Sequence, residues 1–109
     1  MSASWRAEKL SSWIQKKAAF FLSSNIRIKN GIIAANRVEL NKNLTKAAIL
    51  ITVYPEKEEK ETISKLRTLK KDFTEYIKKD FRGRKLPSFE FAIDEGEKKR
   101  IKIEELLAR

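Results

Sequence analysis

Two apolar segments joined by a short polar one constrain the fold of this chain more than any other feature. Residues 32–40 and 47–54 are rich in β-branched and aliphatic side chains that alternate between two faces, and polar residues 41–43 separate them. A period of two is typical of a strand buried on one face, and so short a connection favours an antiparallel hairpin. Pro55 follows the second segment. Because proline cannot donate to the ladder, it predicts the end of that strand.

Segments of helical periodicity flank the predicted hairpin. In residues 4–22 and again in residues 56–82, apolar side chains recur at steps of three and four, which places them on one stripe of a helix. The second helix could be one long piece or two shorter ones. Gly83 is expected to end it as a left-handed residue, since glycine adopts positive φ without steric cost. Residues 88–94 alternate again and predict a third strand after Pro87.

The order of these elements predicts an α+β fold in a single domain spanning residues 1–109. It reads α-β-β-α(α)-β, and a three-stranded sheet would be covered on one face by helices. Residues 103–109 are expected to form a short C-terminal helix or tail.

The missing residue types narrow the possible function. The 109-residue chain has no Cys and no His, so it lacks thiolate nucleophiles, zinc-knuckle ligands and the commonest general base. We therefore expect no metal site, no cofactor and no enzymatic activity. A carboxylate- or lysine-dependent enzyme is the alternative, but it has no positive support in the sequence.

The charge balance points to an anionic partner. The chain has 25 Lys and Arg against 15 Asp and Glu, for a formal net charge of +10. A solvated helix face alone would not require so large an excess, and nucleic acid is the first partner to consider. The candidate phosphate contacts are Arg67, Lys70, Lys71, Lys78, Lys79, Arg82, Arg84 and Lys85, with Arg27 and Lys29 as a second group. Lys70, Lys71, Lys78 and Arg82 are expected to share one helical face.

Localisation follows from what the sequence lacks. No apolar run approaches the ~20 residues needed to cross a bilayer, and charges and serines interrupt the N-terminal segment every few residues. We expect a cytoplasmic monomer without membrane contact.

Three blocks of the chain resemble those of the ribosome-binding factor A family. Residues 32–53 are similar to the family's strand pair, V-E-V-S-x-D-L-x-x-A-x-V-x-V-S-V. Residues 86–95 are similar to x-P-x-L-x-F-x-x-D-x, and residues 103–107 to I-x-x-L-L. The resemblance implies a type II KH-like fold in which a helix–kink–helix, marked by Ala-x-Gly, replaces the glycine-rich loop. Here the equivalent positions are Leu69-Lys70-Lys71, so the small residues are absent and two lysines stand where RNA would approach.

The resemblance also implies a function. Members of this family bind the free or immature 30S subunit and its 16S rRNA, and they assist late maturation and rRNA processing, which matters most in the cold. The alternative is a basic module that binds DNA or another RNA away from the ribosome. The predicted hairpin before the long helix argues against a helix-turn-helix DNA reader, which usually has no intervening sheet.

Overall fold

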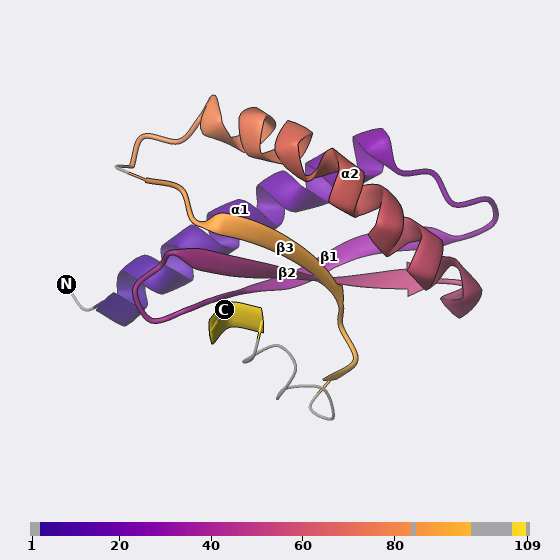
Figure 1. Ribbon diagram of the computed structural model, residues 1–109, viewed down its shortest axis with the longest axis horizontal. Coiled ribbons are helices and arrows are strands. Elements are labelled where there is room, and N and C mark those ends of the chain that lie inside the picture. Colours follow the sequence, from indigo (N-terminus) through magenta and orange to yellow (C-terminus); the bar gives the residue numbers. More distant parts are fainter. Residues whose placement is uncertain (1–2, 84, 97–105, 109) are drawn as a thin grey trace.

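The predicted hairpin is present, and a third strand extends it into a sheet. The computed structural model describes residues 3–83, 85–96 and 106–108. In it, β1 (Ile32–Leu40) pairs antiparallel with β2 (Lys46–Tyr54), and β3 (Ser88–Ile93) pairs parallel with the other edge of β2. The sheet order is therefore β1-β2-β3 (Figure 1). A parallel neighbour requires a long crossover, which explains why a helix separates β2 from β3 in the sequence.

The β1–β2 connection is held by one polar side chain. The Oδ1 atom of Asn41 accepts hydrogen bonds from the backbone N–H groups of Thr45 (2.8 Å) and Lys46 (2.9 Å). The N–H of Leu44 donates to the Asn41 carbonyl at 3.1 Å, and Leu44 adopts a positive φ of 59°. Asparagine commonly bonds its own following backbone in this way, so the polar turn expected at residues 41–43 is confirmed.

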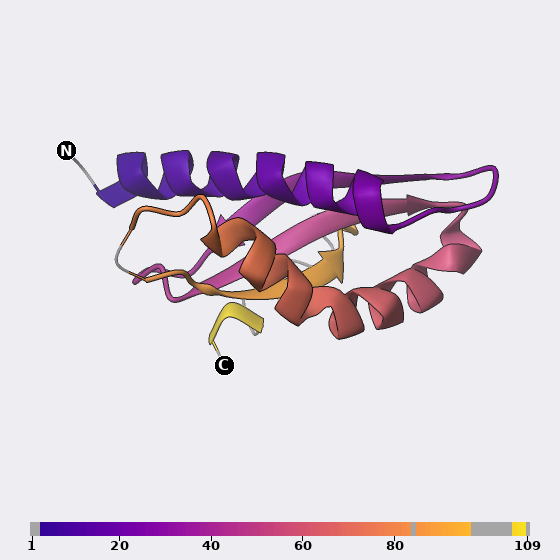
Figure 2. The same cartoon turned by 90° about the horizontal axis from the view of Figure 1, so that it is seen from above.

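Two helices cover the same face of the sheet. Helix α1 (Ala3–Asn25) lies against β1, while the 3₁₀ turn η1 (Glu56–Glu58) leads into α2 (Glu59–Lys78), which lies against β3 (Figures 1 and 2). The order is the predicted α-β-β-α(α)-β, so the α+β fold class is confirmed. Their shared core contains the fully buried Ile14, Ile49 and Phe73.

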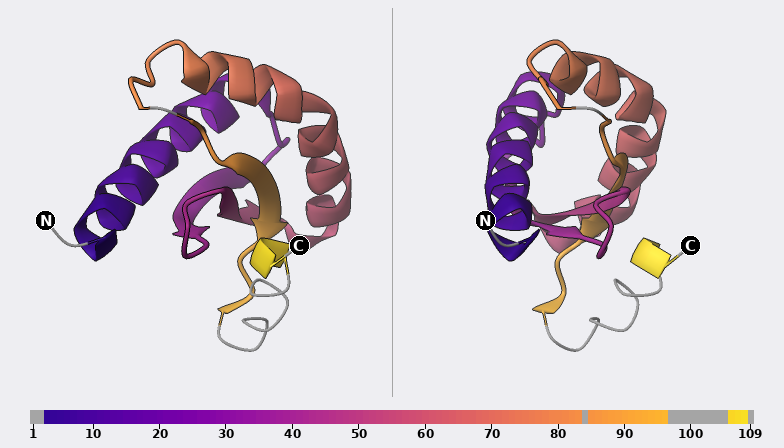
Figure 3. Two further views of the ribbon diagram at one scale, coloured as in Figure 1. Left: turned by 60° about the vertical axis from the view of Figure 1, so that its left-hand side comes forward. Right: turned by 90° about the vertical axis from the view of Figure 1, so that its left-hand side faces the viewer.

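The central strand β2 is buried on both faces. Ile49, Ile51 and Val53 point toward the helices, as their spacing predicts. On the other face Ala48 and Leu50 are fully buried, because Ala92, Leu106 and Leu107 pack against them. The two leucines belong to a helical turn formed by residues 106–108, drawn in yellow in Figure 3. Part of the expected C-terminal segment is thus helical, and residues 97–105 and 109 lie outside the described residues.

The end of α2 differs from the sequence prediction in two respects. The helix ends at Lys78, so Arg82 lies in the following segment and not on the helical face shared by Lys71 and Lys78. Gly83 does not have a positive φ, so its expected role as a left-handed cap is wrong. It is instead a site of close approach, because a Cβ there would clash with the ring of Phe81.

Helix α2 is continuous through Leu69-Lys70-Lys71, where the family resemblance implies a kink. Its axis nevertheless changes direction part-way along (Figure 3, left). The Oγ1 atom of Thr74 donates to the Lys70 carbonyl at 2.9 Å, and that of Thr68 donates to the Lys65 carbonyl at 2.7 Å. Such back-bonding by threonine tends to bend helices. The two threonines therefore provide a local cause for a bend without an Ala-x-Gly step.

A polar cluster at the end of β3 makes a testable contribution to stability. The carboxylate of Asp94 accepts hydrogen bonds from Asn36 Nδ2 (3.0 Å) and the Gly96 N–H (3.2 Å), and Arg37 lies 3.5 Å away. These contacts, with the Asn36 hydrogen bond foremost, hold the pKa of Asp94 below its usual value. We expect Asp94→Asn to lower the free energy of unfolding by about 1–2 kcal/mol near neutral pH.

The pH dependence of that loss has a defined sign. Because the pKa of Asp94 is lowered in the folded state, its contribution is complete above the unfolded value of about 3.9 and is lost as the pH falls through the folded value. In urea titrations, the difference in free energy of unfolding between wild type and Asp94→Asn should therefore shrink as the pH falls from about 5 to about 2. A gap that stays constant over this range would contradict the assignment.

Candidate nucleic-acid interface

Four cations form a line along the exposed side of α2. Lys60, Arg67, Lys71 and Lys78 are separated by seven, four and seven residues, and all four are exposed. At 100° per residue these steps bring each side chain back to nearly the same side of the helix. The line, called here the α2 stripe, is about 27 Å long at 1.5 Å per residue.

The core fixes the direction in which the α2 stripe faces. Leu66, Phe73 and Ile77 are fully buried between α2 and the sheet, which sets the rotation of the helix about its axis. The α2 stripe then lies on the flank of the helix beyond the buried side, open to solvent. The packing of the buried side of α2 is therefore enough to place the four cations in a row on the surface.

Lys70 differs from its neighbours in the stripe. Its Nζ atom lies 3.1 Å from the Oε1 atom of Glu90 on β3, and the side chains of both residues are about two-fifths exposed. This pair links α2 to the edge strand and offsets the Lys70 charge. Lys70 is thus half-buried and paired with a carboxylate, whereas Arg67 and Lys71 are exposed.

The opposite flank of α2 is tied to α1 near its end. Lys17 on α1 donates to the carboxylate of Asp80, and its Nζ atom lies 5.6 Å from the ring centre of Tyr76. The hydrogen bond lowers the pKa of Asp80 and raises that of Lys17. Lys79, directly before Asp80 in the sequence, is also exposed. It points about 100° away from Lys78 around the helix axis, so it does not extend the α2 stripe.

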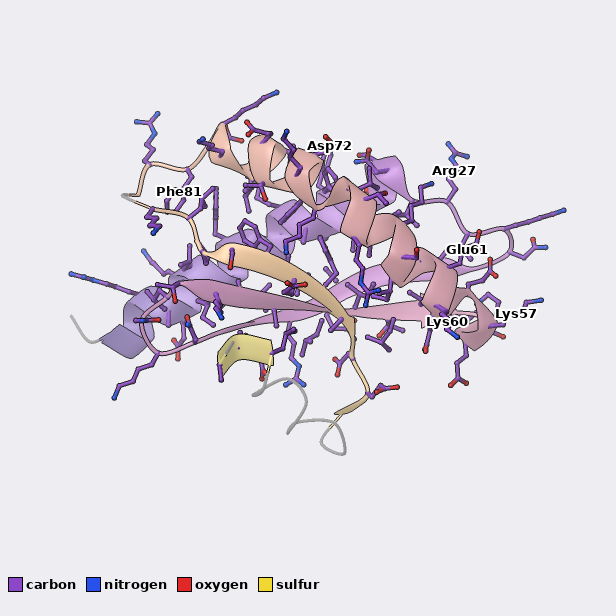
Figure 4. All side chains as sticks on the ribbon, in the orientation of Figure 1. Arg27, Lys57, Lys60, Glu61, Asp72 and Phe81 are labelled. Carbon is purple, nitrogen blue, oxygen red and sulfur yellow. The ribbon has the colours of Figure 1, made fainter. Side chains whose placement is uncertain are left out.

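The remaining candidates lie at opposite ends of the molecule. Arg82 and Lys85 are exposed in the segment after α2, while Arg84 between them lies outside the described residues. Arg27 and Lys29 are exposed in the α1–β1 loop at the other end of the longest axis, as the positions of Arg27 and Phe81 show (Figure 4). The predicted residues that the structure describes therefore do not form one cluster. Arg67, Lys71 and Lys78 share a line on α2, Arg82 and Lys85 follow the helix, and Arg27 and Lys29 lie at the opposite end of the molecule.

A match to a family model establishes how this chain is related to other proteins. Residues 6–107 match the model of ribosome-binding factor A. The chain belongs to the ribosome-binding factor A family. The blocks that carried the resemblance all lie within the matched span, so the relationship inferred from the sequence is confirmed.

Individual members of the family agree with this assignment. The chain is 26% identical to ribosome-binding factor A of Flavobacterium johnsoniae over 110 aligned positions, covering 94% of this chain and 83% of that protein. A solution structure of a Thermotoga maritima protein assigned to ribosome-binding factor A shares 30% identity, with a TM-score of 0.70 over 88% of this chain and 93% of that one. The crystal structure of the Thermus thermophilus factor has a TM-score of 0.69 at 17% identity, covering 80% and 93%, and supports the fold alone.

Sequence reasoning missed one member of the α2 stripe. Lys60 lies among Glu58, Glu59 and Glu61. Because these acidic neighbours dominate the local charge, the sequence does not mark Lys60 as part of a basic surface. Counting back seven residues from Arg67 would have placed it on the same face. The match to ribosome-binding factor A includes this position, and Figure 4 shows Lys60 at the start of α2 near Lys57.

The part of the chain that the structure describes offers little for other chemistry. Within it, no three His, Cys, Asp or Glu side chains gather where they could hold a metal ion. None of its helices is long and apolar enough to span a membrane.

Proposed function

We propose that this chain binds the free or immature small ribosomal subunit through its 16S rRNA and assists late maturation, including rRNA processing. The observation that carries the proposal is the α2 stripe, a row of exposed cations on a member of the ribosome-binding factor A family. The protein would act in the cytoplasm as a monomer, and by binding rather than by catalysis. Its main partner would be ribosomal RNA.

The stripe suits a phosphate backbone. Arg and Lys side chains neutralise phosphates and release condensed counterions, which supplies most of the affinity of such complexes. Several cations in one line can follow consecutive phosphates of one RNA strand or one groove edge, and these contacts set orientation without reading bases. Specificity would then come from the shape of the rRNA site, as is usual for structured RNA.

The candidate residues take different parts in this proposal. Arg67, Lys71 and Lys78 would contact phosphates directly, and Lys60 would extend their line. Lys79, Arg82, Arg84 and Lys85 would continue the contact beyond the helix end. Lys70 would act by holding α2 against β3 through Glu90, and Arg27 with Lys29 would meet a second part of the RNA.

The proposal is tested by co-sedimentation with purified ribosomal particles. The protein should sediment with free small subunits and much less with whole ribosomes, because the proposed target is the free or immature small subunit. Duplex DNA, added at the same nucleotide concentration as the rRNA, should not displace the protein from the small subunits. Equal binding to whole ribosomes, or ready displacement by DNA, would overturn the proposal in favour of a general nucleic-acid-binding module.

A further inference from the structure

A groove lies at one end of the molecule, just beyond the C-terminal end of α2. Three segments meet there: the start of α1, the β1–β2 turn and the segment after α2, which face the viewer in the right panel of Figure 3. Its volume is about 560 Å³, within the range of ~300–1,000 Å³ that is usual for ligand sites. We call it the end groove.

The lining of the end groove combines apolar and cationic side chains. Its apolar wall consists of Leu10, Leu44, Phe81 and Leu86, and its charged groups are Arg6 and Lys85. The described residues that line it include no carboxylate. An occupant should therefore have a flat or apolar part for the wall and a negative charge for the two cations.

Leu44 is the residue that folding does not explain. It has a φ of 59°, a region that costs a branched or bulky side chain energy and that Gly or Asn enters more easily. Its side chain is half-buried but lies outside the hydrophobic clusters of the described residues. Leu44 thus has an unfavourable backbone conformation and does not contribute to the core. We take this as an indication that its side chain serves the groove that it lines.

Contacts within the protein hold the Leu44 and Phe81 sides of the groove in place. Leu44 lies in the turn that the Asn41 side chain holds, and the Ser88 N–H ties β3 to the Thr45 carbonyl at 2.9 Å. Opposite, the ring of Phe81 lies over Gly83 and 5.6 Å from the ring centre of Trp13. A preformed aromatic surface of this kind loses little entropy on binding.

We propose that the end groove binds one unpaired nucleotide of RNA, with its base against Phe81 and Leu44 and its phosphates near Arg6 and Lys85. Any base can stack on an aromatic ring, so the site would accept an unstacked nucleotide without strict sequence preference. The inference rests on the proposed function, because it assumes that RNA reaches this end of the molecule. Arg82, exposed between the α2 stripe and Lys85, marks a path along which one strand could continue.

The test uses the intact protein and a fluorescein-labelled single strand of ten uridines. Leu44→Asn removes the apolar contact and suits the positive φ, so the melting temperature should not fall. We expect it to weaken binding about 10-fold, and Arg6→Ala with Lys85→Ala to weaken it by a similar factor. The matched control is Ile32→Asn, since Ile32 is 63% exposed and lies outside the groove.

A second readout locates the base directly. With 4-thiouridine in the strand, photocrosslinks should map to residues 41–46 or 81–86 in wild type and should decrease in Leu44→Asn. Unchanged affinity and crosslinks elsewhere would overturn the groove assignment, even if wild type still sediments with free small subunits. If Leu44→Asn weakens subunit binding but not binding of the single strand, the groove contacts another part of the subunit and the assignment to an unpaired nucleotide is wrong.

Discussion

Reversing Arg67, Lys71 and Lys78 to glutamate should weaken binding to free small subunits about 100-fold or more near 0.1 M salt. Each phosphate contact contributes about 0.7–0.9 to the slope of log affinity against log salt concentration, so three lost contacts lower it by about 2–3. The three side chains are exposed and lie on one line of α2. Fluorescence-detected binding at several salt concentrations would measure both quantities.

The control must carry the same change in net charge. Reversal of Lys9, Lys16 and Lys42, three exposed lysines on α1 and in the β1–β2 turn, should reduce affinity far less and leave the slope within about one unit of wild type. If both triple variants lose affinity equally, binding depends on total charge and the α2 stripe has no special role. Lys70→Gln is a separate case, since breaking its pair with Glu90 should act on the placement of α2.

Phe73→Ala should cause the largest loss of stability among single substitutions in α2, about 3–5 kcal/mol. The ring of Phe73 is fully buried and meets Phe21, Phe89 and Phe91 edge-on, with ring centres 5.2, 5.0 and 5.3 Å away. It therefore joins α1, α2 and β3. The free energy of unfolding of a typical domain is about 5–15 kcal/mol. The midpoint of urea unfolding should therefore fall markedly, or the transition should lose its cooperativity.

Phe20→Ala is the matched comparison, since it removes the same atoms from a surface site. Phe20 is 64% exposed and stacks on Tyr76 with ring centres 6.4 Å apart. Its loss should cost less than about 1 kcal/mol. Phe73→Leu, which keeps most of the volume, should fall between the two. Similar losses for Phe20→Ala and Phe73→Ala would contradict the packing described for α2.

The elements of the fold were predictable because each has a local physical signature. The alternation in residues 32–40 and 47–54, with Pro55 after them, identified β1 and β2 to within one residue. Helical spacing identified the apolar side of α2. The end of α2 was less predictable, since Gly83 does not cap the helix and instead makes room for the ring of Phe81. That requirement arises from a contact made in three dimensions.

The sequence predicted the type of partner of the candidate interface, but only part of the spatial arrangement of its cations. The excess of Lys and Arg pointed to nucleic acid, and spacing placed Lys71 and Lys78 together. It could not reveal that Lys70 pairs with Glu90, because that contact joins residues twenty positions apart. The end groove was also out of reach, since its three segments come together only when the sheet and helices pack.

Directed cleavage of 16S rRNA is the most direct test of the claim that the α2 stripe faces the RNA. The chain has no Cys, so Ser64→Cys and Ala34→Cys each provide one attachment site for a hydroxyl-radical-generating iron chelate. Ser64 is exposed between Lys60 and Arg67, whereas Ala34 is exposed on β1 and faces away from the helices. In complexes with free small subunits, we expect strong, localised rRNA cleavage from position 64 and weak cleavage from position 34. Stronger cleavage from position 34 would contradict the proposed orientation.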